Sequence, residues 1–142
     1  MSELVYKEES YKIIGACFEV YKQKGCGFTE AVYQECLAIE FELQKIPFVE
    51  QPKIQLAYKG RVLGQYFQPD YVCYNKIIVE IKALPALIEI NKSQTLNYLN
   101  ATNFDLALLV NFGHFPKVEY KRIANNLKKT SISIREEIES WL

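Results

Sequence analysis

The chain has 142 residues, of which 49% are hydrophobic and 24% charged, a composition that excludes an intrinsically disordered protein. Its 17 basic and 17 acidic residues cancel, which argues against strong non-specific adhesion to nucleic acid but leaves room for a local basic groove. No run approaches the roughly 18 apolar residues of a membrane span, and no signal-peptide pattern opens the chain. We therefore expect a cytoplasmic protein that does not engage a membrane.

The length predicts a single domain, residues 1–142, able to bury a core without help from metals or disulfides. No C-x-x-C pair is present, and His114 is the only histidine that could join the cysteines as a zinc ligand. We expect free thiols in a reducing compartment at Cys17, Cys26, Cys36 and Cys73. No G-x-x-x-x-G-K-[ST] run is present either, so no nucleotide cofactor is expected.

Two helices are predicted at the start of the chain. The first runs from Ser10 to Lys24, with Ser10 as its N-cap and Gly25 as its stop. The second runs from Thr29 to Lys45 and is apolar on two sides, so we expect it to be sandwiched between the first helix and a sheet. Its two apolar stripes are Val32, Cys36, Ile39 and Leu43 on one side, and Leu37 and Phe41 on the other.

Glu30 falls in the first turn of the second helix, near the rim of the buried face. Its carboxylate can lean towards the sheet and take part in a site there. It can equally be a helix-stabilising residue, because a negative charge at a helix N-terminus contributes about 0.3–1 kcal/mol. The residues alone leave both alternatives open.

Strands are predicted in the middle of the chain, where alternating and β-branched residues are bounded by turn signals. We expect three antiparallel strands in sequence. Pro52 opens the first strand. The second combines the overlapping segments Arg61 to Tyr66 and Gln65 to Cys73, and the third runs from Lys76 to Lys82. The first strand ends at a turn formed by Lys59 and Gly60.

Helical and strand patterns alternate in the last third of the chain. A helix is predicted from Glu89 to Asn100. The near-continuous apolar run from Phe104 to Phe112 predicts a strand covered on both faces, which can lie parallel to its neighbour because it follows a crossover helix. Val118 to Ile123 can add an edge strand, and Ser131 to Leu142 has the spacing of a short amphipathic helix.

The stretch QPDYVCYNKIIVEIKA, from Gln68 to Ala83, contains the charges that most need an explanation. Side chains alternate along a strand, so Glu80 and Lys82 share one face while their apolar neighbours pack on the other. A three-residue turn from Tyr74 to Lys76 would place Asp70 directly across from Glu80. Opposed residues have Cβ atoms roughly 4.5–5.5 Å apart, and like charges at that distance repel. A positive charge is therefore expected between them.

A divalent cation is one candidate for that charge, because hard ions such as Mg²⁺ and Mn²⁺ take oxygen ligands from one or two carboxylates plus water and phosphate. Lys82 would stand close to the same site and could stabilise charge on a phosphate. In the alternative interpretation Asp70 is a turn residue after Pro69, and Glu80 and Lys82 form a surface ion pair. That alternative predicts little effect on stability when the charges are neutralised.

The whole pattern of P-D, nine residues and E-x-K resembles the PD-(D/E)XK phosphodiesterase superfamily. Upstream, the G-x-x-E-x-x-Y sequence from Gly27 to Tyr33 resembles the signature of the small GxxExxY family within it. Gln94 and Tyr98 supply a Q-x-x-x-Y motif, and residues 111–113 supply N-F-G. The resemblance covers Tyr11 to Ile123. Each motif is weak alone, and their order and spacing make the match specific.

The resemblance implies a restriction-endonuclease-like fold of the α/β (mixed α+β) class, with a central mixed sheet of about four or five strands flanked by helices. It implies a core at residues 11–123, with the helical tail predicted from the spacing at residues 131–142. It also implies Mg²⁺ or Mn²⁺ bound by Asp70, Glu80 and the backbone carbonyl of Ile81, and nucleic acid, with DNA favoured, as the partner.

Further roles follow from the same resemblance. Glu30 would join the metal site, and Lys82 would position or activate the attacking water. Tyr33 would pack over the Glu30 carboxylate or hydrogen-bond to it. Gln94 and Tyr98 would border the site, although a plain helix packing face explains this pair equally well. In a competing hypothesis, the protein is an inactive scaffold that binds nucleic acid or protein. A homodimer is compatible with either hypothesis.

Overall fold

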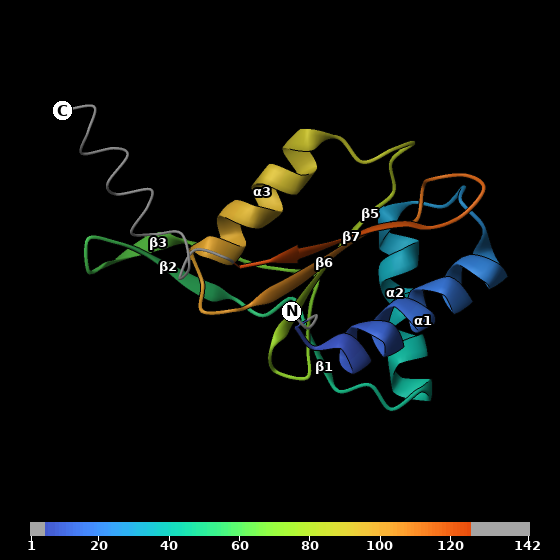
Figure 1. The fold of residues 1–142 in the computed structure, drawn as a ribbon, viewed down its shortest axis with the longest axis horizontal. Helices are drawn as coiled ribbons and strands as arrows, with labels where there is room; N and C mark the ends of the chain where they lie inside the picture. The colour runs from blue at the N-terminus through green and yellow to red at the C-terminus, as the bar shows by residue number, and fades with distance from the viewer. Residues whose placement is uncertain (1–4, 126–142) are drawn as a thin grey trace, which may run out of the picture.

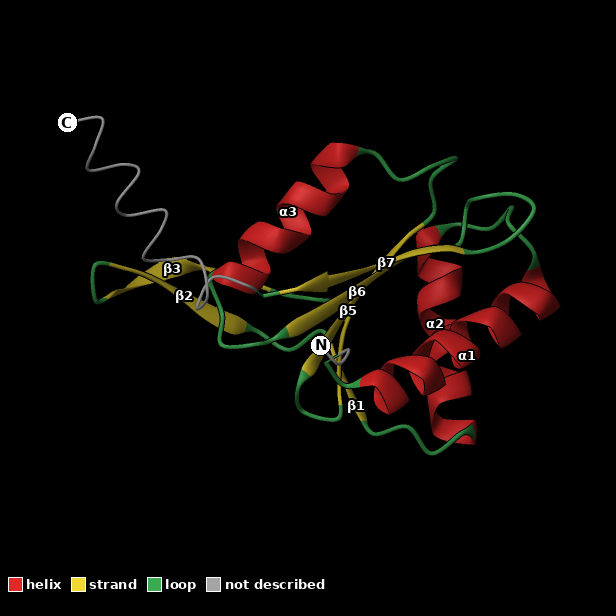
Figure 2. Cartoon of the chain, viewed as in Figure 1, coloured by secondary structure: helices red, strands yellow, loops and turns green. Residues whose placement is uncertain are grey.

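A five-stranded sheet in the order β1-β4-β5-β6-β7 separates two helical layers in the computed structural model, which describes residues 5–125 (Figure 1). Helices α1 and α2 cover one face, and α3 lies on the other (Figure 2). The helices are α1 (Lys7–Lys24), α2 (Glu30–Leu43) and α3 (Glu89–Asn100). The strands are β1 (Phe48–Glu50), β2 (Ile54–Tyr58), β3 (Arg61–Phe67), β4 (Tyr71–Cys73), β5 (Ile77–Lys82), β6 (Leu106–Asn111) and β7 (Glu119–Ala124).

The sheet is mixed, as the sequence predicts. β4 pairs antiparallel with both β1 and β5, β5 pairs parallel with β6, and β6 pairs antiparallel with the edge strand β7. A parallel pair needs a crossover connection, and α3 supplies it between β5 and β6. The predicted helix from Glu89 to Asn100, the parallel buried strand and the edge strand are all confirmed.

The two faces of the sheet build two apolar clusters of different size. The larger cluster lies under α1 and α2 and includes Ile77, Val79 and Ile81 of β5. The smaller cluster lies on the α3 side and includes Ile78 of β5, together with Leu99 of α3. Because strand residues alternate between faces, Glu80 and Lys82 fall on the α3 side, at the margin of the smaller cluster.

The first helix begins earlier than expected. Its N-cap is Tyr6, and the predicted cap Ser10 lies inside the helix, buried, with its Oγ donating to the Tyr6 carbonyl at 2.7 Å. The prediction of Ser10 as the cap is therefore wrong, because a serine in the first turn can bond back to the preceding turn. Gly25 ends the helix as predicted, at φ 71°, a conformation that glycine adopts without strain.

Helix α2 is buried along one side only. Its covered residues are Tyr33, Leu37, Ala38 and Phe41, whereas Ile39 is 57% exposed and Leu43 72% exposed. The expected burial is confirmed for the stripe of Leu37 and Phe41. It is wrong for the outer half of the other stripe, because Val32 and Cys36 are half-buried but Ile39 and Leu43 are exposed.

The central strands also differ from the prediction. The segment from Gln65 to Cys73 is interrupted at residues 68–70, around Pro69, which has no N–H to donate to a ladder. β2 and β3 consequently form a separate two-stranded sheet, and the short strand β1, which the sequence does not signal, takes the place beside β4. The predicted helix from Ser131 to Leu142 lies outside the described residues. Across residues 5–125, none of the helices combines the length and apolarity needed to cross a bilayer.

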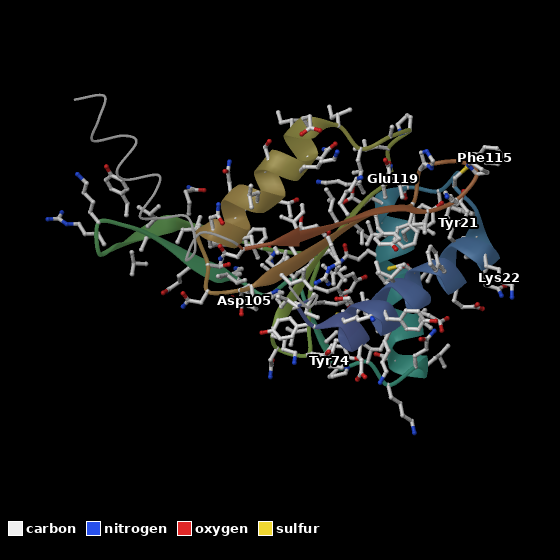
Figure 3. The ribbon with its side chains drawn as sticks, in the orientation of Figure 1. Tyr21, Lys22, Tyr74, Asp105, Phe115 and Glu119 are labelled. Carbon is white, nitrogen blue, oxygen red and sulfur yellow. The ribbon has the colours of Figure 1, made fainter. Side chains whose placement is uncertain are left out.

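The N-F-G motif clamps the chain that leaves β5. The Asn111 Oδ1 accepts hydrogen bonds from the Leu84 N–H at 2.8 Å and the Gly113 N–H at 3.1 Å, and its Nδ2 donates to the Leu84 carbonyl at 2.9 Å. A Cβ on Gly113 would lie 2.5 Å from the Leu84 backbone. Glu119 (Figure 3) completes the clamp by accepting from the Asn111 Nδ2 at 3.2 Å. The motif therefore fixes the backbone two residues beyond Lys82.

Replacing Gly113 with alanine tests this clamp. The added methyl group must displace the Leu84 backbone, so Gly113→Ala is expected to lower the free energy of unfolding by about 1–3 kcal/mol, as overpacking does elsewhere. Urea denaturation measures the change. Gly15→Ala is the matched control, because the Gly15 Cβ would meet no atom within 4 Å on an exposed helical turn and should stabilise the helix. Equal stability of Gly113→Ala and the wild type would contradict the clamp.

Candidate active site

The two acidic residues of the central hairpin meet as the turn predicts. The register pairs Cys73 with Ile77 and Tyr71 with Val79, so the next pair along the same ladder is Asp70 and Glu80. The turn has three residues, with Tyr74 at φ 55° and Asn75 at φ 58°. The odd loop length places both carboxylates on the α3 side of the sheet.

Asp70 and the end of β5 are joined by two reciprocal hydrogen bonds. The Asp70 N–H donates to the Glu80 Oε1 at 3.0 Å, and the Ile81 N–H donates to the Asp70 Oδ2 at 2.8 Å. Each carboxylate therefore has one oxygen bonded to the neighbouring strand's backbone. This arrangement fixes the position of both groups before any ligand arrives.

Burial makes both carboxyls reluctant to ionise. Removal from water, followed by the Asp70 charge, raises the pKa of Glu80, the Asp70 N–H and Lys82 lower it, and the net pKa is about 8. Removal from water likewise raises the pKa of Asp70 to about 6, against the lowering effect of the Ile81 N–H bond. Near neutral pH the pair thus retains the Glu80 proton, which an ordinary surface carboxyl group would have lost.

Lys82 and Glu30 contribute charge from opposite sides. Lys82 is half-buried on the same face as Glu80, and its ammonium lowers the pKa of both carboxyls. Within residues 5–125 it forms no ion pair closer than 4.0 Å, so the surface ion pair with Glu80 of the alternative interpretation is not formed. Glu30, the exposed first residue of α2, raises the pKa of both carboxyls and so lies within electrostatic reach of them.

A pocket of about 180 Å³ opens beside these groups. Its walls come from β3, β5, α3 and the residues after β3, namely Tyr66, Phe67, Gln68, Glu80, Lys82, Gln94, Thr95 and Tyr98. Tyr98 stacks on Phe67 with ring centroids 4.2 Å apart. The structure therefore brings Gln94 and Tyr98 to the same pocket as Lys82. The sequence analysis does not predict Tyr66 and Phe67 in the pocket wall, because strand periodicity does not reveal the break around Pro69 that follows them.

Tyr33 is placed differently from the expectation. Its ring is fully buried and stacks on Phe112 at 4.7 Å, while its hydroxyl donates to the Gly25 carbonyl and accepts from the Phe28 N–H at 3.2 Å. No hydrogen bond from Tyr33 to Glu30 is present. A helical side chain leans towards the N-terminus of its helix, so the tyrosine anchors the loop that leads into α2 and positions Glu30 only indirectly.

The donor set of Asp70 and Glu80 suits a hard divalent cation. No group of three or more histidine, cysteine, aspartate and glutamate side chains in the described part of the chain could hold a metal ion, so a cage made of side chains alone is not present there. Two carboxylates in register are, however, the number that Mg²⁺ uses when water and a substrate phosphate complete its shell. Their mutual repulsion in a partly buried site is also what a cation would relieve.

The raised pKa values predict how stability depends on pH in the absence of metal. Between the ordinary pKa values of 3.8 and 4.5 and the native values of about 6 and about 8, the folded state binds more protons than the unfolded state. The free energy of unfolding should therefore fall as pH rises through this window, and Glu80→Gln should flatten that decline. Urea denaturation in EDTA from about pH 5 to about pH 8.5 measures it. A wild-type slope retained in Glu80→Gln but altered in Glu35→Gln, an exposed control on α2, would refute it.

The comparison with known families agrees with the geometry. The model of the PD-(D/E)XK nuclease superfamily matches residues 7–123, which include all the residues of the pocket and both carboxylates. Searches of curated proteins and of solved structures returned no match. The mixed five-stranded sheet with helices on both faces is consistent with the restriction-endonuclease-like fold of that superfamily. By its sequence match and its fold, the chain belongs to the PD-(D/E)XK nuclease superfamily.

Proposed function

We propose that this protein is a Mg²⁺- or Mn²⁺-dependent nuclease that hydrolyses phosphodiester bonds in nucleic acid, with DNA as the favoured substrate. One observation carries the proposal. Asp70 and Glu80 are held in register by reciprocal backbone hydrogen bonds, with Lys82 on the same face and no ion pair to it within residues 5–125. If Lys82 formed a surface ion pair with Glu80, its ammonium charge would be neutralised and no free positive charge would lie beside the pocket.

Each residue of the site would have a separate role in this reaction. Asp70, Glu80 and the Ile81 carbonyl would hold the cation, and Glu30 would reach the site through water or a second cation. When bound, a divalent cation supplies positive charge for the scissile phosphate and acidifies water. Lys82 would orient the attacking water and stabilise negative charge on the phosphate. Gln94 and Tyr98 would line the path of the substrate strand.

The finer family assignment rests on the G-x-x-E-x-x-Y sequence. We assign the chain to the GxxExxY family because Tyr33 anchors the loop at Gly25 and Phe28, one turn from Glu30. The motif then has a structural meaning, since it fixes the start of α2 near the two carboxylates. Homodimer formation and a cytoplasmic location stay predictions from the sequence.

A non-catalytic binding module is the second candidate. Zero net charge and the absence, within residues 5–125, of a three-ligand metal cluster favour it. The two candidates differ in whether a cation binds at Asp70 and Glu80 and in whether the bound protein cuts nucleic acid. Both properties can be measured separately.

Calorimetric titration with Mn²⁺ tests the cation site. Asp70→Asn and Glu80→Gln are each expected to weaken binding by more than about 100-fold, because even residues that only orient metal ligands are worth about 10–100-fold. Glu30→Gln should weaken it less, since Glu30 is exposed at the margin of the site. Glu35→Gln, also exposed on α2, is the matched control. Identical titrations for the wild type and Asp70→Asn would rule out this site.

Cleavage assays test the role of Lys82. Single-stranded, duplex and branched DNA, each with an RNA counterpart, should be compared with Mg²⁺, Mn²⁺ and EDTA. Lys82→Ala is expected to lower the rate on the preferred substrate by about 100- to 10,000-fold, the usual contribution of a proton-handling group. Lys12→Ala, at an exposed position of α1, should cut normally. If the wild type shows no cation-dependent cleavage of any substrate, the nuclease proposal fails.

A further inference from the structure

The β2–β3 hairpin concentrates positive charge in a protein that is neutral overall. The segment from Gln51 to Pro69 contains three basic residues and no aspartate or glutamate. All three basic residues, Lys53, Lys59 and Arg61, are exposed. Since the whole chain has equal numbers of basic and acidic residues, the remainder is acidic. A polyanion approaching this protein is therefore attracted to the hairpin.

The hairpin projects from the body of the protein beside α3 (Figure 1). Only its base is packed, because Ile54, Leu56 and Phe67 join the smaller apolar cluster. Two hydrogen bonds close its neck. The Gln68 Nε2 donates to the Gln51 carbonyl at 2.8 Å, and the Gln51 N–H donates to the Asp70 carbonyl at 3.0 Å. The hairpin is thus fixed relative to Asp70 and Glu80.

Tyr66 belongs both to the β2–β3 hairpin and to the wall of the pocket. It is 47% exposed and lines the pocket together with Glu80 and Lys82. The Lys53 Nζ lies 5.0 Å from its ring centroid. An exposed ring can stack on a base, and a cation beside it can contact the adjoining phosphate, a combination typical of proteins that bind single strands.

A second pair of the same kind lies nearer the tip. The Lys59 Nζ is 5.5 Å from the ring centroid of Tyr58, which is 65% exposed, and Arg61 is the cross-strand partner of Tyr58. Tyr66 pairs with Gln55, and Lys59, in the turn after β2, is four residues beyond Gln55, or roughly 13 Å. Arg61 and Tyr66 are five residues apart on β3 and so lie on opposite faces of the strand, and the basic residues therefore extend outward from the pocket around both faces of the hairpin.

We propose that the β2–β3 hairpin is an arm that holds a single nucleic-acid strand beside the pocket, with Tyr66 stacking on an unpaired base and Lys53, Lys59 and Arg61 contacting phosphates. The proposal rests on the nuclease function proposed above and specifies its substrate class. A paired base inside a duplex has both faces covered by its neighbours, so stacking on Tyr66 requires an unpaired nucleotide. The small pocket beside it is likewise suited to one strand.

Fluorescence anisotropy with a labelled single-stranded oligonucleotide in EDTA tests the arm without cleavage. Tyr66→Ala is expected to weaken binding by about 5- to 150-fold, the range measured for base stacking, and Tyr66→Phe should restore it. The triple variant Lys53→Gln, Lys59→Gln, Arg61→Gln should reduce the salt dependence of log K by about 2, at about 0.7 per phosphate contact. Tyr11→Ala and Lys12→Gln, on exposed α1 positions, are the matched controls.

The outcomes separate the arm from the chemistry. Wild-type affinity in both Tyr66→Ala and the triple variant would overturn the arm, whether or not the protein cuts. Tighter binding of a duplex than of a single strand, with no loss in Tyr66→Ala, would overturn the stacking proposal. Arm-dependent binding in a protein that never cleaves would support the arm while removing the nuclease function.

Discussion

Two backbone hydrogen bonds between Asp70 and the end of β5 organise the candidate site. They hold two carboxylates side by side that would otherwise repel each other. The register that permits them depends on a turn of odd length, in which Tyr74 and Asn75 adopt left-handed conformations. A slip by one residue would move Asp70 to the opposite face of the sheet and separate it from Glu80. The raised pKa values of the two carboxyls and the proposed cation site therefore both derive from one strand pairing.

Several residues of the family-like motifs have a structural role, because they hold the backbone near the site in place. Asn111 and Gly113 fix the chain just beyond Lys82. Tyr33 fixes the loop before Glu30 through bonds to main-chain atoms, and Tyr21 (Figure 3) donates to the His114 carbonyl at 2.8 Å, tying α1 to the loop after β6. A motif of this kind predicts where chemical groups are placed, and its own side chains need not touch a substrate.

Local patterns were sufficient to predict the central hairpin and its opposed carboxylates, the third helix and the buried parallel strand. Patterns failed where a partner far along the chain decides the outcome. The three residues of β1 have no periodicity of their own and are a strand only because β4 lies beside them. Ile39 and Leu43 have the spacing of a buried stripe but meet no covering element within residues 5–125. The wall of the pocket at Tyr66 depends on the bend at Pro69, which periodicity does not encode.

The hairpin leaves and re-enters the sheet at one point, because Glu50 of β1 pairs with Tyr71 of β4 and Gln51 bonds to Asp70. Lengthening its tip at the turn of Lys59 and Gly60 would cost little, since loop closure entropy grows only logarithmically with length. The core would not be disturbed, because the neck is closed independently of the tip. The outer part of the hairpin, beyond its packed base, could thus change in length and sequence during evolution without moving Asp70 and Glu80.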